Sequence, residues 1–153
     1  MYNPYIVYPC QYCVNMSRFN YPKTIEDERL VKIKDYGPRP LVININEATL
    51  QNNTFRTALW TGNHLQVTLM SIKVGNDIGL EIHPNVDQFI RIEKGQALVK
   101  MGRIKNKLDF QAKAYDDFAI MIPAGTWHNI INIGNTPLRS EEHTSELQSH
   151  LNL

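Results

Sequence analysis

The pattern of apolar and polar positions changes near residue 41. Residues 1–36 hold many Tyr, Pro and Asn residues without a sustained hydrophobic period, which predicts an irregular N-terminal arm. Beyond it, apolar residues come in short runs separated by Gly, Pro and Asn, and Leu65, Val67 and Leu69 alternate with polar neighbours as in a half-buried strand. We expect strands at residues 41–45, 65–69, 78–83, 88–93, 96–101, 118–122 and 128–133.

This succession of short strands, with no long helical period, predicts an all-β sandwich or barrel. Residues 46–48 are expected to form a short helix or turn. The length of 153 residues fits one domain. We therefore expect an arm at residues 1–36 and a β-domain at residues 37–138.

Charge and composition exclude several classes of protein. Sixteen basic residues face fifteen acidic ones, with no basic stripe, so we expect no nucleic-acid partner. The longest apolar runs are far too short to cross a membrane, and the N-terminus lacks the pattern of a secretory signal. We expect a cytoplasmic protein. Cys10 and Cys13 form a C-x-x-C pair in the Tyr-rich arm, which favours a flexible or self-associating tail over redox chemistry.

Four side chains are candidates for a metal site. Glu81 and His83 lie on the same face of an expected strand, because side chains alternate along a strand. Gln88 opens the returning strand after a turn, close to His83. His128 begins another strand just after Pro123-Ala124-Gly125 and could supply a fourth ligand.

Each of these residues has an ordinary alternative interpretation. A single His in a β-protein is more often hydrogen-bonded in the core or at the surface, and a Glu or Gln at a strand end is more often solvated. The joint spacing of the four residues is what favours a metal site.

The spacing resembles the two motifs of the cupin family. In the first, Gly75 is followed by Glu81-Ile82-His83, Gln88 and Gly95; in the second, Asp117 is followed by Pro123-Ala124-Gly125, His128 and Asn132. The resemblance covers roughly residues 65–138. It implies a cupin jelly-roll β-barrel that binds one divalent metal.

Three positions depart from the family pattern. Glu81 replaces the first His, Gln88 replaces the usual Glu, and Asp117 replaces the Gly that opens the second motif. Asp tolerates turn geometry, so the last change is expected to be harmless. The ligand set becomes Glu81, His83, Gln88 and His128, which still suits zinc, manganese or iron.

The chain also resembles small stand-alone bacterial cupins of the mannose-6-phosphate isomerase-like group. This resemblance implies a metal-dependent enzyme acting on a small sugar or sugar phosphate, with Arg56, Asp87 or Tyr115 as candidates for moving protons. Arg91 is expected on the surface. Two other hypotheses stay open: a non-catalytic cupin that binds a small ligand, and a structural or coat-associated protein.

A homodimer is a further expectation from the family resemblance, since a second subunit covers an edge strand that is otherwise prone to aggregate. Ile43 and Ile45 are candidates for the interface, although ordinary core packing would explain them equally well.

The C-terminal residues do not resemble a native sequence. Residues 139–150 read Arg-Ser-Glu-Glu-His-Thr-Ser-Glu-Leu-Gln-Ser-His, which resembles the in-frame translation of a common sequencing-adapter oligonucleotide. Alternating apolar residues stop at Leu138, where a strand that closes the barrel is expected. We therefore expect residues 139–153 to be a non-native tail, the final strand to be missing, and His143 and His150 to have no functional role.

Overall fold

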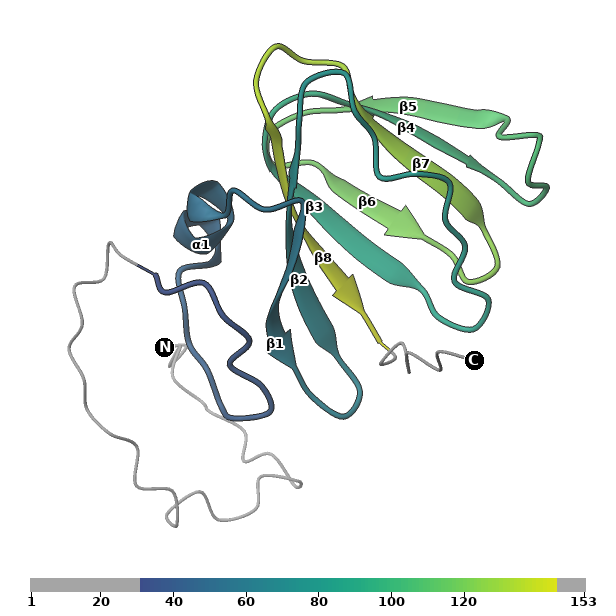
Figure 1. The fold of residues 1–153 in the computed structure, drawn as a ribbon. Coiled ribbons are helices and arrows are strands. Elements are labelled where there is room, and N and C mark those ends of the chain that lie inside the picture. The colour runs from purple at the N-terminus through teal and green to yellow at the C-terminus, as the bar shows by residue number, and fades with distance from the viewer. Residues whose placement is uncertain (1–30, 146–153) are drawn as a thin grey trace, which may run out of the picture.

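Two antiparallel sheets form the body of the protein (Figure 1). The computed structural model describes residues 31–145. One short helix precedes the strands of this described part. The elements are α1 (Ile45–Gln51), β1 (Arg56–Thr61), β2 (Gln66–Ile72), β3 (Gln88–Lys94), β4 (Ala97–Gly102), β5 (Phe110–Ala114), β6 (Ala119–Ile122), β7 (Trp127–Asn132) and β8 (Leu138–Thr144).

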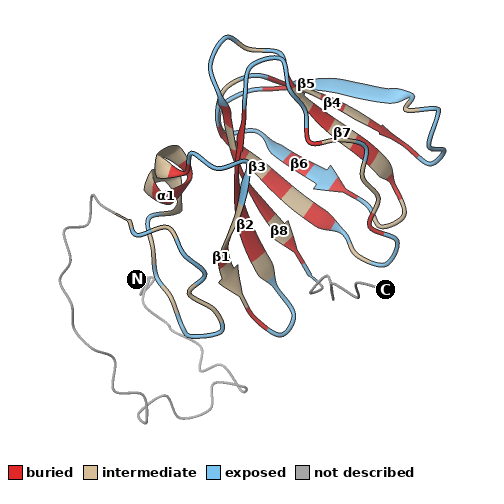
Figure 2. Cartoon of the chain, viewed as in Figure 1, coloured by how far each residue is buried: buried red, intermediate tan, exposed pale blue. Residues whose placement is uncertain are grey.

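The strand order is β1-β2-β8-β3-β6 in the larger sheet and β5-β4-β7 in the smaller one. Apolar side chains from both sheets meet in one core, with Met70 and Ile90 from the larger sheet and Val99 and Ile130 from the smaller. Figure 2 shows buried positions as red bands along the strands of both sheets. The expected all-β jelly-roll fold is confirmed.

Strand periodicity determines which residues face this core. In β3, Gln88, Ile90 and Ile92 are buried, whereas Phe89 and Arg91 between them are only partly buried. This alternation is the two-residue period of a pleated strand. It places Gln88 on the inner face of the sheet and Arg91 on the outer face, as the sequence predicts.

A second, smaller core lies on the outer face of β1 and β2. Ala48 of α1 packs there with Leu59, Val67 and Leu69. Partly buried residues from the segment before the strands complete this cluster: Val31, Ile33, Tyr36, Ile43 and Ile45. Ile43 and Ile45 therefore pack within their own chain, and this packing accounts for their apolar character.

Several expected elements differ from the observed ones. Residues 41–45 are not a strand, because Asn44 caps α1 by accepting a hydrogen bond from Glu47 N, and the helix begins at Ile45. The short helix expected at residues 46–48 is confirmed. Residues 78–83 form no continuous strand, and isolated bridges at Asp77 and Glu81 connect this segment to β7.

The C-terminal residues correct one prediction outright. The final strand is present: β8 pairs with β2 on one side and β3 on the other, in the middle of the larger sheet. Backbone pairing in a sheet does not depend on side-chain identity, which explains how an atypical sequence can occupy this place. Residues 146–153, including His150, and residues 1–30, including Cys10 and Cys13, lie outside the described part of the chain.

The side chains of β8 are poorly suited to this central position. Leu138 is the apolar exception, while Ser140, Glu141, Glu142 and Thr144 are all buried. Four residues of the strand each have a buried polar atom without a hydrogen-bond partner among the described residues: Arg139, Ser140, Glu141 and His143. Such orphaned atoms are few in native proteins.

Two turn positions confirm the backbone geometry that the motifs predict. Asp117 has a positive φ of 67°, a conformation that Asp accepts more readily than most residues with a side chain. Gly95 has a positive φ of 118°, a conformation that is strained for residues with a side chain. A Cβ atom there would also lie only 3.1 Å from Leu138 Cα, which is a tight contact with the backbone. Among the described residues, no helix is long and apolar enough to span a membrane.

Candidate metal centre

A backbone bridge joins the two segments that carry the candidate ligands. Glu81 N donates to His128 O at 3.0 Å, and His128 N donates to Glu81 O at 2.9 Å. Residues that exchange both hydrogen bonds lie directly opposite one another, with their side chains on the same face. Nearby, Gly125 N donates to His83 O at 2.8 Å, which fixes the turn before β7 against the same segment.

This pairing brings a carboxylate and two imidazoles together. The ligand atoms of Glu81, His83 and His128 all lie within 4.8 Å of one another. The two imidazole rings have centroids 5.8 Å apart. Since metal–ligand bonds are about 2 Å long, one ion can reach all three groups after small side-chain adjustments.

The hydrogen bonding of His128 directs one nitrogen toward this cluster. Its Nδ1 lies 3.0 Å from Thr126 O, and because a carbonyl oxygen only accepts, Nδ1 carries the proton. The Nε2 of the neutral ring then keeps its lone pair. This atom is buried and has no hydrogen-bond partner among the described residues. An imidazole oriented in this way is a preformed metal ligand.

Burial favours the form of His128 that can bind a metal. Burial lowers the pKa of the His128 imidazole below its ordinary value, because the low-dielectric interior disfavours the charged ring. The ring is therefore neutral at physiological pH. His83 is 9% exposed, with Nε2 at 3.9 Å from Glu81 Oε2.

Glu81 has a second partner besides the imidazoles. Arg56 Nη2 donates to Glu81 Oε1 at 3.0 Å and to Oε2 at 3.3 Å. Burial by itself would raise the pKa of Glu81, but contact with His83 and the charge of Arg56 outweigh burial and lower it. Glu81 is thus an ionised carboxylate shared between an arginine and the histidine pair.

Gln88 reaches the cluster indirectly. Its Nε2 donates to Glu142 Oε1, while its Oε1, the atom that would ligate a metal, is buried with no hydrogen-bond partner among the described residues. Glu142 Oε2 in turn lies 3.8 Å from Arg56 Nη2. Burial raises the pKa of the Glu142 carboxyl. The structure thus brings Glu81, His83 and His128 together and leaves Gln88 linked to them through Glu142.

The other residues considered for chemistry lie in different surroundings. Tyr115 packs edge-on against Phe118, next to the end of β3 that is farthest from Gln88. Asp87 accepts a hydrogen bond from Ala124 N and serves the turn. Arg91 pairs with Glu93 and Asp117 on the outer face. Of the three proton-moving candidates, only Arg56 lies in the cluster.

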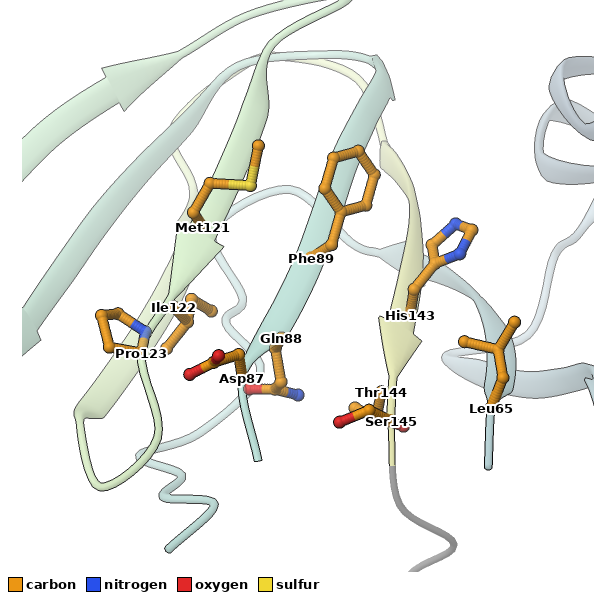
Figure 3. Close-up of a pocket in the computed structure, with 10 residues that line it drawn as sticks. All are labelled: Leu65, Asp87, Gln88, Phe89, Met121, Ile122, Pro123, His143, Thr144 and Ser145. Carbon is orange, nitrogen blue, oxygen red and sulfur yellow. The ribbon is translucent and has the colours of Figure 1, made fainter. Parts of the chain in front are cut away.

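A separate hollow of about 620 Å³ lies beside the start of β3 (Figure 3). Phe89 and His143 form part of its wall and meet edge to face with ring centroids 5.3 Å apart. Its lining residues are Leu65, Asp87, Gln88, Phe89, Met121, Ile122, Pro123, His143, Thr144 and Ser145. Only Gln88 among the candidate ligands lines it, so this hollow is distinct from the histidine cluster.

Glu142 is the member of the cluster that the sequence did not indicate. It belongs to no motif, and no strand was expected where it lies. The signal available in the sequence was parity: once a strand is placed at residues 138–144, Glu142 shares a face with Leu138, which is buried.

The two antiparallel sheets face one another and form a jelly-roll barrel. One carboxylate and two imidazoles converge across a backbone bridge and provide the donor groups of a metal site. Comparison with known proteins gives the family. Residues 68–140 match the Cupin domain family. The protein in the crystal structure of BH2720 from Bacillus halodurans is 58% identical in sequence to this chain. The two structures match with a TM-score of 0.75, and the match covers 76% of this chain and 88% of that one. This chain therefore contains a cupin domain.

Two curated relatives extend the comparison. Uncharacterized protein YrkC of Bacillus subtilis (strain 168) is 68% identical over 113 residues, or 74% of this chain and 61% of that protein. An uncharacterized protein of Acanthamoeba polyphaga mimivirus is 50% identical over 95 residues, or 62% of this chain and 58% of that protein. The matched stretch thus spans about three fifths of the length of these curated relatives.

Proposed function

We propose that this chain is a metal-binding cupin that acts as an isomerase-type enzyme on a small sugar or sugar phosphate. One divalent cation, zinc, manganese or iron, would be held by His83 and His128 with Glu81 and Gln88. The observation that carries the proposal is the convergence of the Glu81, His83 and His128 ligand atoms within 4.8 Å of one another.

The donor set fits such a cation. Two neutral imidazoles and one carboxylate suit zinc, manganese and iron alike, because each accepts nitrogen and oxygen ligands. The buried Nε2 of His128 and Oε1 of Gln88 have no other partner among the described residues. When bound, a divalent cation supplies Lewis-acid polarisation of a carbonyl or hydroxyl oxygen.

The chain's own side chains define what else such a site can do. The Arg56 guanidinium can donate hydrogen bonds to a substrate oxygen, and its 35% exposed side chain is accessible to a small molecule. Glu81 is an ionised carboxylate beside it and can accept a proton when it is not bound to the metal. An aldose–ketose isomerisation needs these two roles, a donor at oxygen and a base at carbon.

A specific observation favours non-catalytic ligand binding as the second candidate. Asp87 accepts a hydrogen bond in the turn before β3, and Tyr115 packs at the far end of the barrel. Among the described residues, Glu81 and Glu142 are therefore the carboxylates beside the imidazoles. If Glu81 is bound to the metal, Glu142 is the carboxylate that remains beside the imidazoles, and it already accepts a hydrogen bond from Gln88 Nε2. The structural or coat-associated hypothesis rests on the arm at residues 1–36, of which residues 1–30 lie outside the described part.

An assay of sugar-phosphate isomerisation tests the enzyme proposal. Purified protein loaded in turn with zinc, manganese or iron is incubated with mannose 6-phosphate, and fructose 6-phosphate is measured. We expect turnover that is lost on chelation and in His83→Ala, and kept in His64→Ala, a change at an exposed histidine. Metal-dependent sugar binding without turnover would instead establish the binding function.

A further inference from the structure

Arg56 is placed to contact a ligand at the histidine cluster. It opens β1 directly opposite Met70, whose side chain is buried in the barrel core. Residues directly opposite one another in a sheet share a face, so the Arg56 side chain is directed into the barrel. It does not face the outer cluster, which is the smaller core around α1 on the other side of β1 and β2. Its partner there is Glu81, one of the three converging ligand groups.

The guanidinium has donors to spare. Within the described part of the chain, its hydrogen bonds and ion pairs to Glu81 and Glu142 all use Nη2. Arginine carries five N–H donors in a planar fork, so Nη1 and Nε remain available. The centroid of the Phe55 ring lies 5.8 Å from Arg56 Cζ, and this ring supports the position of the guanidinium. Arg56 can therefore bind a second anion without releasing Glu81.

The charge balance of the cluster favours such an anion. A divalent cation and Arg56 together bring more positive charge than the carboxylates of Glu81 and Glu142 offset. A site of largely buried side chains with excess positive charge attracts negatively charged ligands. Guanidinium groups bind phosphate and carboxylate through paired, charge-assisted hydrogen bonds.

We propose that Arg56 binds the phosphate or carboxylate group of the ligand that occupies the metal site, which makes that ligand an anionic sugar derivative. This inference rests on the proposed function. It names Arg56 as the residue that distinguishes a sugar phosphate or sugar acid from the neutral sugar.

Calorimetric titration of the metal-loaded protein with mannose 6-phosphate, mannose and glucuronate tests it. The unchanged protein should bind a charged probe at least about tenfold more tightly than mannose, in line with the strength of charge-assisted hydrogen bonds. Tighter binding of mannose 6-phosphate identifies a phosphate ligand, and tighter binding of glucuronate identifies a carboxylate ligand. Equal binding of charged and neutral probes would overturn the inference.

Variants show whether the preference depends on Arg56. Arg56→Gln should abolish it, and Arg56→Lys, which keeps the charge next to Glu81 but loses the fork, should leave an intermediate preference. Arg91→Gln removes the same charge on the outer face and should change nothing. A full preference in Arg56→Gln, with metal content intact, would contradict the inference. Absence of metal from the unchanged protein would overturn the proposed function itself.

Discussion

Asn132, the last residue of the second motif, connects the end of β2 to the loop between β7 and β8 through a single buried side chain. Its Nδ2 donates to Ile72 O at 2.9 Å and to Thr136 O at 2.8 Å, and its Oδ1 accepts from Gly134 N at 2.9 Å. The residue is 2% exposed. All the recorded partners are backbone atoms, so its function is to hold the end of β7 against the strands beside it.

Removing this amide should therefore reduce stability without affecting the metal site. Asn132→Ala leaves two carbonyls and one N–H without their side-chain partner, and we expect a loss of about 2–4 kcal/mol in the free energy of unfolding. Urea unfolding measures the loss, with Asn135→Ala at an exposed position as the control. Metal content should stay unchanged. Loss of metal with stability intact would assign Asn132 to the site instead.

Individual residues of the site were predictable where a motif specified them. Strand parity acts over two residues and placed Glu81 and His83 on one face. Their convergence with His128 was expected from the resemblance of both motifs to the cupin pattern, and the backbone bridge between Glu81 and His128 accounts for it. The contact between Arg56 and Glu81 joins positions 25 residues apart and depends on the path of β1 in the sheet. No local pattern predicts that path.

At the level of elements, β8 combines regular pairing with unsuitable side chains. Ser140 lies opposite Met70 on one side and Ile92 on the other, in the middle of the apolar core. It is 1% exposed, and its Oγ has no hydrogen-bond partner among the described residues. We propose that residues 139–150 derive from an adapter sequence and that the native strand carries apolar residues at the inward positions.

Replacing Ser140 with Val should therefore stabilise the protein. The substitution removes an unpaired buried hydroxyl and adds apolar contact with Met70 and Ile92, and we expect a gain of about 1 kcal/mol in the free energy of unfolding. Ser145→Val, at an exposed position, is the control and should have no effect. A loss of stability in Ser140→Val would argue that the hydroxyl is a native feature.

Resequencing of the source DNA tests the origin of residues 139–150 directly, since unchanged codons would exclude an adapter.

The elements that sequence patterns missed are those with weak periodicity. In β5, Phe110 to Lys113 are all exposed, so no alternation marks it as a strand. In contrast, β3 and β7 alternate clearly and were predicted within a residue or so at each end. The strand expected at residues 41–45 was wrong because the N-cap at Asn44 outweighs the β-branched composition around it.

At the scale of the whole molecule, the barrel determines the distance between two short segments far apart in the chain. Glu81 and His83 precede β3, and His128 is the second residue of β7 in the other sheet, yet backbone hydrogen bonds between residues 76–83 and residues 125–132 join the two segments. The outer cluster around α1 covers the opposite face of β1 and β2. The fold was predictable from its strand and turn pattern, whereas the charges that surround the site required the tertiary structure.

Metal analysis of the purified protein tests the central claim most directly. Protein expressed with zinc, manganese and iron supplied is analysed by mass spectrometry alongside His83→Ala, His128→Ala and the control His64→Ala. We predict about one divalent ion per chain in the unchanged protein and in His64→Ala, and a loss of about tenfold or more in affinity in each of the other two variants, since each lacks one imidazole ligand. Unchanged metal content in both His83→Ala and His128→Ala would contradict the proposed metal site.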